Sequence, residues 1–239
     1  MNIWGKIIGS TSGFALGGPI GALIGGAAGH AIDKMHIKTK RSDELALKQI
    51  GFTIGIIVLS AKMAKADGKV TKQEILAFKN KIDVPDPEIK NVAYLWDQAK
   101  KSTQGYEVYA QQISNLLEKN SPVLEELLNL LIVIAEADGK ITHPEIIYLK
   151  RVSEIFGFSN EDFERIISYK IKDPSNPYKI LGISENTPIS DVKKIWKKLA
   201  TKHHPDLLIS QGMPRELIKQ NTQRLTEINN AWETIKKQS

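Results

Sequence analysis

The chain contains three stretches in which hydrophobic and polar residues follow different patterns, and each pattern predicts a different kind of element. The residues from Ile7 to Ile32 include no Asp, Glu, Lys or Arg, which is typical of a membrane-spanning segment. Residues 43–170 repeat apolar positions at helical spacing, without a convincing period-2 stretch of the kind that strands show. Residues 178–239 contain two amphipathic helical stretches separated by a short polar break. We therefore predict an all-α protein.

The uncharged N-terminal stretch is 26 residues long. As a helix it would extend about 39 Å, which exceeds the roughly 30 Å of a hydrocarbon core. A cleaved signal peptide is the alternative, but its charged region would be Lys6 alone, and Gly29-His30-Ala31 is a poor cleavage site. We therefore predict a transmembrane helix that anchors the protein, over residues 1–33.

Basic residues follow the predicted anchor directly, in a juxtamembrane linker over residues 34–42. They are Lys34, Lys38, Lys40 and Arg41. Such charges are retained on the cytoplasmic side of a membrane. We expect a single-pass protein of the inner (cytoplasmic) membrane, with a short N-terminus outside and the other domains in the cytoplasm.

Glycines recur at every fourth position through the anchor, at Gly5, Gly9, Gly13, Gly17, Gly21, Gly25 and Gly29. On a helix they form a stripe without side chains, against which a second helix can pack closely. We favour a homodimer, formed in membrane lipid through this glycine stripe, over a glycine-rich span without a partner. Gly17-Gly18-Pro19 can kink the helix or divide it into a hairpin. The kinked single pass is preferred, because each half of a hairpin, about 14 residues, is too short to span.

The middle of the chain contains an internal repeat. Residues 64–75 and 135–146 are identical at eight of 12 positions and lie 71 residues apart. A match of this density indicates two related helix–loop–helix units, packed as a pseudo-symmetric bundle. We assign residues 43–170 to this helical domain.

Each copy of the repeat places an Asp-Gly turn before a Thr-x-x-Glu sequence, which begins at Thr71 and at Thr142. This spacing is that of a capping box, in which Thr caps a helix and Glu bonds back to the cap. An EF-hand calcium loop would need oxygen ligands where Met63 and Ile134 stand, so a standard EF-hand is excluded.

The repeated loops resemble the TerB-like family of tellurite-resistance proteins, whose two halves carry similar Ala-Asp-Gly…Glu sequences. The resemblance implies an all-α fold and an acidic cluster from both halves that would bind a divalent cation. Its members here would be Asp67, Glu74, Asp138 and Glu145. We favour a capping role for these residues over metal binding, and we therefore expect no obligatory cofactor.

The last part of the chain follows a turn-rich linker over residues 171–177. Ser190 is expected to cap a helix from about Asp191 to His203. One face of this helix is basic, with Lys193, Lys194, Lys197 and Lys198. After His204-Pro205-Asp206, a second helix is expected to begin near Pro214. Its predicted apolar positions are Leu217, Leu225, Ile228, Ala231, Trp232 and Ile235. The two helices predict a helical hairpin over residues 178–239.

These features resemble the J-domain, the module with which DnaJ-type co-chaperones activate Hsp70 (DnaK). The matching sequences are Pro177-Tyr178-x-x-Leu181-Gly182, the lysine-rich helix, His204-Pro205-Asp206 and Leu225-Thr226-Glu227-Ile228-Asn229-Asn230-Ala231-Trp232. The resemblance implies that the tripeptide and the four lysines contact Hsp70, and that the chain itself is not an enzyme. We expect Pro205 to end the helix so that Asp206 projects from a loop, which His204 orients by a hydrogen bond.

Composition and charge exclude several other classes. The chain has no Cys, which excludes disulfides, thiolate metal sites and cysteine nucleophiles. A formal net charge of +6 would by itself suggest nucleic acid. However, residues 42–170 carry 16 basic and 19 acidic side chains. The basic excess therefore lies beside the anchor and in the C-terminal hairpin, and we expect no nucleic-acid partner.

The order of the three parts resembles the membrane-anchored, DnaJ-like co-chaperones of the DjlA type. This resemblance implies an Hsp70 co-chaperone at the inner membrane, whose middle domain selects a client or senses a signal. Two alternatives stay open. One is a metal- or envelope-stress-sensing TerB-like scaffold that only tethers Hsp70 at the membrane, and the other is a structural membrane oligomer formed through the glycine stripe.

Overall fold

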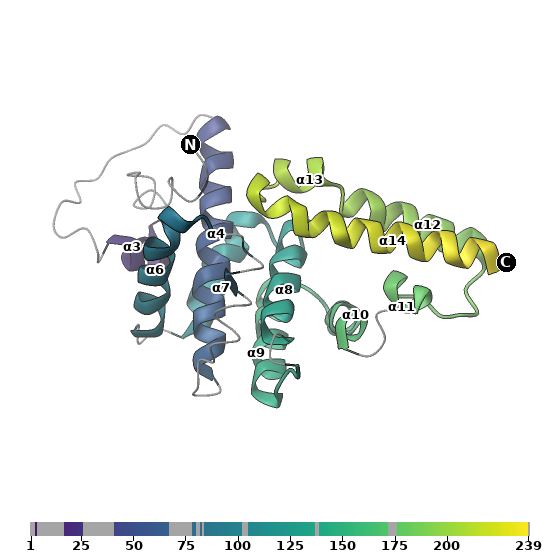
Figure 1. Ribbon diagram of the computed structural model, residues 1–239, viewed down its shortest axis with the longest axis horizontal. Helices are drawn as coiled ribbons and strands as arrows, with labels where there is room; N and C mark the ends of the chain where they lie inside the picture. Colours follow the sequence, from purple (N-terminus) through teal and green to yellow (C-terminus); the bar gives the residue numbers. More distant parts are fainter. Residues whose placement is uncertain are drawn as a thin grey trace.

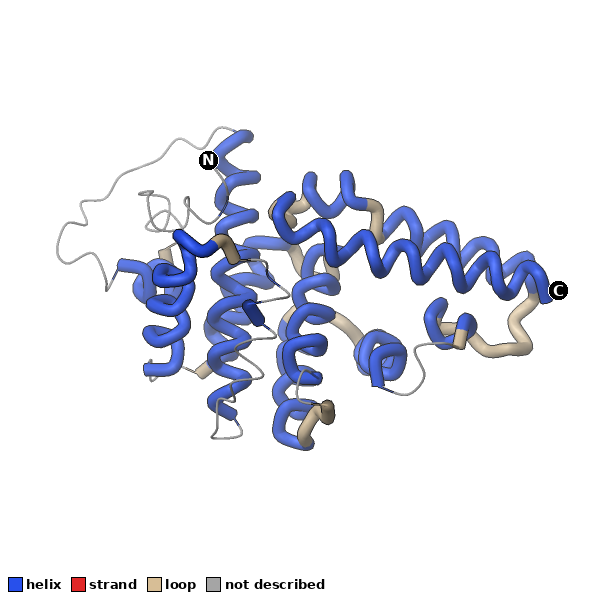
Figure 2. The backbone as a smooth tube through the Cα atoms, viewed as in Figure 1, coloured by secondary structure: helices blue, strands red, loops and turns tan. Residues whose placement is uncertain are grey.

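The protein is described here by a computed structural model, which covers residues 3, 17–25, 41–66, 78–79, 82, 84–101, 105–136, 139–171 and 176–238. Within these ranges every regular element is a helix, as Figure 2 shows. The all-α fold class that the sequence predicted is confirmed.

The middle domain is a bundle around one long helix, α4 (Arg41–Ala66). Its other helices are η1 (Asp86–Glu88), α6 (Ile89–Lys101), α7 (Tyr106–Leu117), α8 (Pro122–Ala135), α9 (His143–Ile155) and α10 (Asn160–Ile171). Helices α6, α7, α8 and α9 all pack directly on α4, which lies between them in Figure 1. The apolar core of the domain therefore forms around α4.

Helix α4 is apolar on all sides and meets the length and hydropathy of a membrane span over Glu44–Ala64. A helix of this kind lies either in a membrane or in the centre of a large core. Ile54, Ile56 and Ile57 are fully buried on different sides of the helix, although the structure contains no membrane. Helix α4 is therefore the core helix of the middle domain, as the sequence predicted for its apolar run.

Of the N-terminal segment, the structure describes Ile3, Gly17 and a short helix, α3 (Gly18–Gly25). Gly17 and Gly18 have φ values of 55° and 58°, so the right-handed helix begins here and does not continue back through Gly17. The interruption lies where the sequence placed a kink. Of the glycine stripe, Gly17, Gly21 and Gly25 are described; Gly5, Gly9, Gly13 and Gly29 lie outside the described residues.

Helix α3 packs on the middle domain, which the sequence did not predict. The Ile20 backbone N–H donates to Gln112 Oε1 at 2.8 Å, and Gln112 Nε2 donates to the Gly17 carbonyl oxygen at 2.8 Å. Ile20 is fully buried. One side chain of α7 thus caps the start of α3, where the Ile20 N–H has no partner within the helix.

The second copy of the internal repeat forms the turn and cap that the sequence predicted. Gly139 has a φ of 103°, a conformation that favours glycine. Thr142 caps α9 in a complete capping box with Glu145, and Pro144 lies in the first turn. The corresponding residues of the first copy, Thr71 and Glu74, lie outside the described residues.

The C-terminal domain is a helical hairpin with short additional helices. These are α11 (Pro177–Leu181), α12 (Ile189–Lys202), α13 (Pro205–Ser210), η3 (Arg215–Leu217) and α14 (Ile218–Gln238). Helices α12 and α14 run side by side, and α13 lies at the end of the hairpin nearest α4 and α8 (Figure 1). Trp196 of α12 and Trp232 of α14 stack with ring centroids 5.2 Å apart, and Trp196 Nε1 donates to Asn229 Oδ1 at 2.9 Å.

Two details of this hairpin correct the sequence predictions. Helix α12 begins at Ile189 with Pro188 as its N-cap, so Ser190 is inside the helix. The Pro188 carbonyl oxygen accepts from the backbone N–H groups of Asp191 and Val192, and the φ of Pro188, −56°, already suits a helix start. Leu225 is only half-buried, and Leu217 packs in the core of the middle domain instead of the hairpin core.

Candidate functional site

The His-Pro-Asp sequence lies at the start of α13. His204 is the N-cap, with its Nδ1 accepting from the Asp206 backbone N–H at 3.2 Å, and Pro205 is the first helical residue. Proline suits this position because its missing N–H needs no partner there. The orienting bond predicted for His204 is therefore present. The open loop predicted around Asp206 is wrong, since Pro205 starts a new helix as well as ending the previous one.

This helix start presents both polar side chains of the tripeptide to solvent. The side chain of His204 is 54% exposed and that of Asp206 is 88% exposed. An exposed carboxylate at a fixed position is a good acceptor for an arginine of another protein. His204 Nδ1 accepts from the Asp206 backbone N–H and so fixes the orientation of the turn. The arrangement therefore suits a contact site for another protein.

The four predicted lysines form an exposed face on α12, beside the tripeptide. Lys193, Lys194, Lys197 and Lys198 are all exposed, whereas Val192 and Leu199 on the opposite side are buried. Lys194 pairs with Asp191 at 2.9 Å, but an exposed pair of this kind contributes little. The face therefore remains positively charged and open to an acidic surface.

The two residues directly before the tripeptide were not selected from the sequence. Lys202 and His203 turn away from solvent and contact Glu125 and Glu126 of α8. Helical spacing is one feature of the sequence that could have indicated Lys202, since this residue lies four residues after Lys198, at the edge of the basic face. Nothing in the sequence indicates its acidic partner, because that partner is 77 residues away.

The predicted cation site is only partly described. Glu145 is 3% exposed, and its Oε2 accepts from the backbone N–H and the hydroxyl of Thr142, both at 2.7 Å. Asp67, Glu74 and Asp138 lie outside the described residues. Among the residues that the structure describes, no group of three His, Asp or Glu could hold a metal ion. The divalent cation site stays a prediction.

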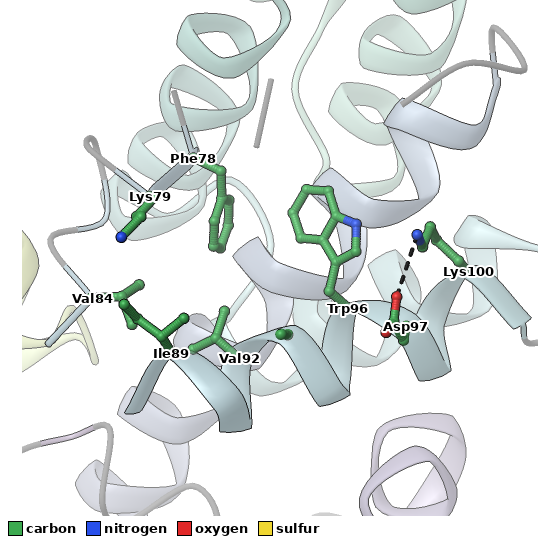
Figure 3. A pocket seen from close by; sticks show the side chains of 9 residues that line it. Phe78, Lys79, Val84, Ile89, Val92, Trp96, Asp97 and Lys100 are labelled. Carbon is green, nitrogen blue, oxygen red and sulfur yellow. Dashed lines mark ion pairs between the residues drawn. The ribbon is translucent and has the colours of Figure 1, made fainter. Parts of the chain in front are cut away.

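The middle domain also contains an apolar cavity of about 200 Å³ beside α6 (Figure 3). Phe78 and Trp96 line it and meet edge-to-face with ring centroids 4.9 Å apart. Lys79 and Lys100 also line it, and Lys100 pairs with Asp97. None of the residues that we selected from the sequence lies in this cavity.

Three families match the chain in succession. Residues 1–48 match the co-chaperone DjlA transmembrane domain, residues 53–168 match tellurite resistance protein TerB, and residues 176–239 match the DnaJ domain. The fold and the exposed His-Pro-Asp site thus define a J-domain protein.

Curated relatives match over almost the whole chain. The co-chaperone protein DjlA of Coxiella burnetii is 28% identical, covering 99% of this chain and 98% of the relative. DjlA of Photobacterium profundum is 26% identical, covering 99% of each. No solved structure matches the chain. The order of its three domains is that of the membrane-anchored DjlA-type co-chaperones, as the sequence predicted.

Proposed function

We propose that the chain is a membrane-anchored co-chaperone whose J-domain stimulates ATP hydrolysis by a partner Hsp70. The observation that carries the proposal is the exposed tripeptide His204-Pro205-Asp206 beside the exposed lysine face of α12. The relatives named as co-chaperones match over nearly their full length, which supports the same function.

The contact would act through charge and fixed geometry. The lysine face attracts an acidic surface of Hsp70 and orients the encounter, as complementary charge does in other complexes. Asp206, fixed at the start of α13, then accepts hydrogen bonds from a basic side chain of the partner. ATP is hydrolysed within Hsp70, and the J-domain favours the conformation in which hydrolysis is fast. In this proposal the chain is not itself an enzyme.

The test is single-turnover ATP hydrolysis by a bacterial Hsp70, with the full chain in lipid nanodiscs. The wild-type chain should accelerate hydrolysis, and His204→Gln should remove the acceleration because the turn loses its cap and its contact. His143→Gln is a matched control, since His143 is an exposed histidine of the middle domain. Equal, negligible rates for wild type and His204→Gln would contradict the proposal and favour the tethering scaffold.

We further propose an inner-membrane location with a short N-terminus outside, and dimerisation through the glycine stripe. Both require α3 to leave its contact with α7 and enter the lipid. The family match of residues 1–48 to a transmembrane domain supports the anchor. The basic residues after the anchor favour a cytoplasmic position for the following domains.

The dimer can be tested with a reporter of helix association in membranes. Replacing Gly13, Gly17 and Gly21 by Leu should abolish the dimer signal, because leucine side chains separate the two backbones. The control replaces Ala15 and Ala27, which lie off the stripe, by Leu. An unchanged signal in the glycine variant would rule out this interface.

A further inference from the structure

The J-domain is attached to the middle domain next to its His-Pro-Asp sequence by an ion pair and by a buried contact between a histidine and a glutamate. Lys202 Nζ lies 2.5 Å from Glu125 Oε2, and His203 Nδ1 lies 2.6 Å from Glu126 Oε1. The side chains of His203, Glu125 and Glu126 are 0%, 1% and 6% exposed. Breaking a buried pair leaves one charge uncompensated, which is strongly unfavourable. The pairs therefore hold the end of α12 on α8.

Glu125 is surrounded by positive groups from two other helices. Arg165 Nη1 of α10 lies 3.0 Å from its Oε1, opposite Lys202. Burial by itself raises the pKa of the Glu125 carboxyl, but the charges of Arg165, Lys202 and His203 lower that pKa to about 2. The contact is therefore ionic at neutral pH.

Apolar side chains extend the contact on the other side of the tripeptide. Leu208, Met213 and Leu217 are buried in the core of the middle domain, separate from the apolar cluster between α12 and α14. Gly212, with a φ of 112°, brings the turn so close to α4 that an added Cβ would lie 2.6 Å from Lys48 Cβ. The J-domain is thus joined to the middle domain by charge and by apolar packing.

This contact leaves the proposed Hsp70-binding surface open. His204 and Asp206 lie between the buried groups on α12 and α13, yet their side chains are 54% and 88% exposed. The hairpin projects from the middle domain with its free end outward (Figure 1). Docking therefore orients the tripeptide without covering it.

We propose that Glu125 and Glu126 of α8 form an intramolecular docking surface for Lys202 and His203, which holds the J-domain in the orientation that binds Hsp70. The inference rests on the proposed co-chaperone function and adds a positioning role for the middle domain. A J-domain fixed in advance loses less orientational freedom on binding Hsp70 than a freely tethered one. Fixing it therefore strengthens productive contact at a given Hsp70 concentration.

The test variant is Glu125→Gln/Glu126→Gln, which keeps the size of both side chains and removes their charges. Lys202→Gln interrupts the same contact from the J-domain side. The matched control is Glu136→Gln/Glu154→Gln, which removes two charges from the same domain outside the contact. All are made in the full chain in nanodiscs of phosphatidylethanolamine and phosphatidylglycerol.

Docking is measured as a distance distribution between two spin labels. The chain has no Cys, so labels are placed without background by Lys150→Cys on α9 and Glu233→Cys on α14, both exposed. The wild type and the control should give one narrow distribution. Both docking variants should give a broad one, while the near-ultraviolet signal of the stacked Trp196 and Trp232 stays unchanged because the J-domain remains folded.

Stimulation of a bacterial Hsp70 at limiting concentration is the second readout. We expect both docking variants to stimulate about fivefold less than wild type, from the cost of ordering a free domain. A narrow distribution in the variants would overturn the docking surface. A broad distribution with equal or greater stimulation would overturn the positioning role. If the wild type fails to stimulate, the proposed function fails as well, and the distance data separate the two cases.

Discussion

At the scale of single residues, two adjacent histidines have opposite environments. His203 is fully buried against Glu126, whereas His204 is 54% exposed and caps α13. The sequence distinguished only His204, because a known motif contains it. The role of His203 depends on α8, which the local sequence does not reveal.

This difference predicts different effects for the same substitution. His203→Ala leaves the buried Glu126 carboxylate without its partner and should lower the free energy of unfolding by about 3 kcal/mol. His204→Ala should change it by less than about 1 kcal/mol, the cost of an exposed cap. Urea unfolding of the full chain, followed by tryptophan fluorescence, measures both. Similar losses for the two variants would contradict the structure around His203.

At the scale of elements, the sequence predicted helix type well and helix ends less well. The apolar periodicity of α4 and α8 and the capping box of α9 were sufficient to place these helices. The start of α12 was misplaced because serine is a common cap, while Pro188 already had a suitable φ of −56°. Close approaches between helices, such as α4 on α7, cannot be read from either helix alone.

Two glycines of α4 test the packing against α7. An added Cβ at Gly55 would lie 2.9 Å from Cδ1 of the fully buried Ile113, and one at Gly51 would lie 2.1 Å from Cδ2 of Leu116. Leu116 is half-buried and can turn toward solvent, whereas Ile113 is fully buried.

Gly55→Ala should therefore destabilise the protein by about 1–3 kcal/mol through overpacking. Gly51→Ala should be neutral, or stabilising by up to about 1 kcal/mol through helix propensity. Urea midpoints of the full chain in nanodiscs measure the two changes side by side. Equal destabilisation by both substitutions would show that Leu116 is as constrained as Ile113.

At the scale of the whole molecule, the charge distribution gains a structural explanation. The acidic middle of the chain and its basic C-terminal part were separate observations in the sequence. In the structure, Glu125 and Glu126 of the acidic middle domain contact Lys202 and His203 of the basic C-terminal domain. The sequence predicted three domains in the right order. It could not predict the junction of the middle and C-terminal domains, since any acidic pair of the middle domain could have been the partner of Lys202 and His203.

This junction should weaken in acid. The pKa of Glu125 is lowered from 4.5 to about 2 in the folded protein. Its stabilisation is therefore complete above pH 4.5 and is lost as the pH falls toward 2. The shift corresponds to roughly 3 kcal/mol. Glu126, Arg165, Lys202 and His203 are the other titratable groups at the junction.

The measurement is urea unfolding of wild type and Glu125→Gln between pH 6 and pH 3. The difference in unfolding free energy between the two should be largest at pH 6 and should shrink toward pH 3. A difference that stays constant over this range would mean that Glu125 has an ordinary pKa.

The burial of Leu208, Met213 and Leu217 in the middle-domain core also affects the order of folding during synthesis. A chain folds from its N-terminus as it leaves the ribosome, so the middle domain emerges before the residues that complete its core. An apolar surface on α4 and α7 then stays uncovered until residues 208–217 have been added. The middle domain therefore completes its core late, only after much of the C-terminal domain has been made.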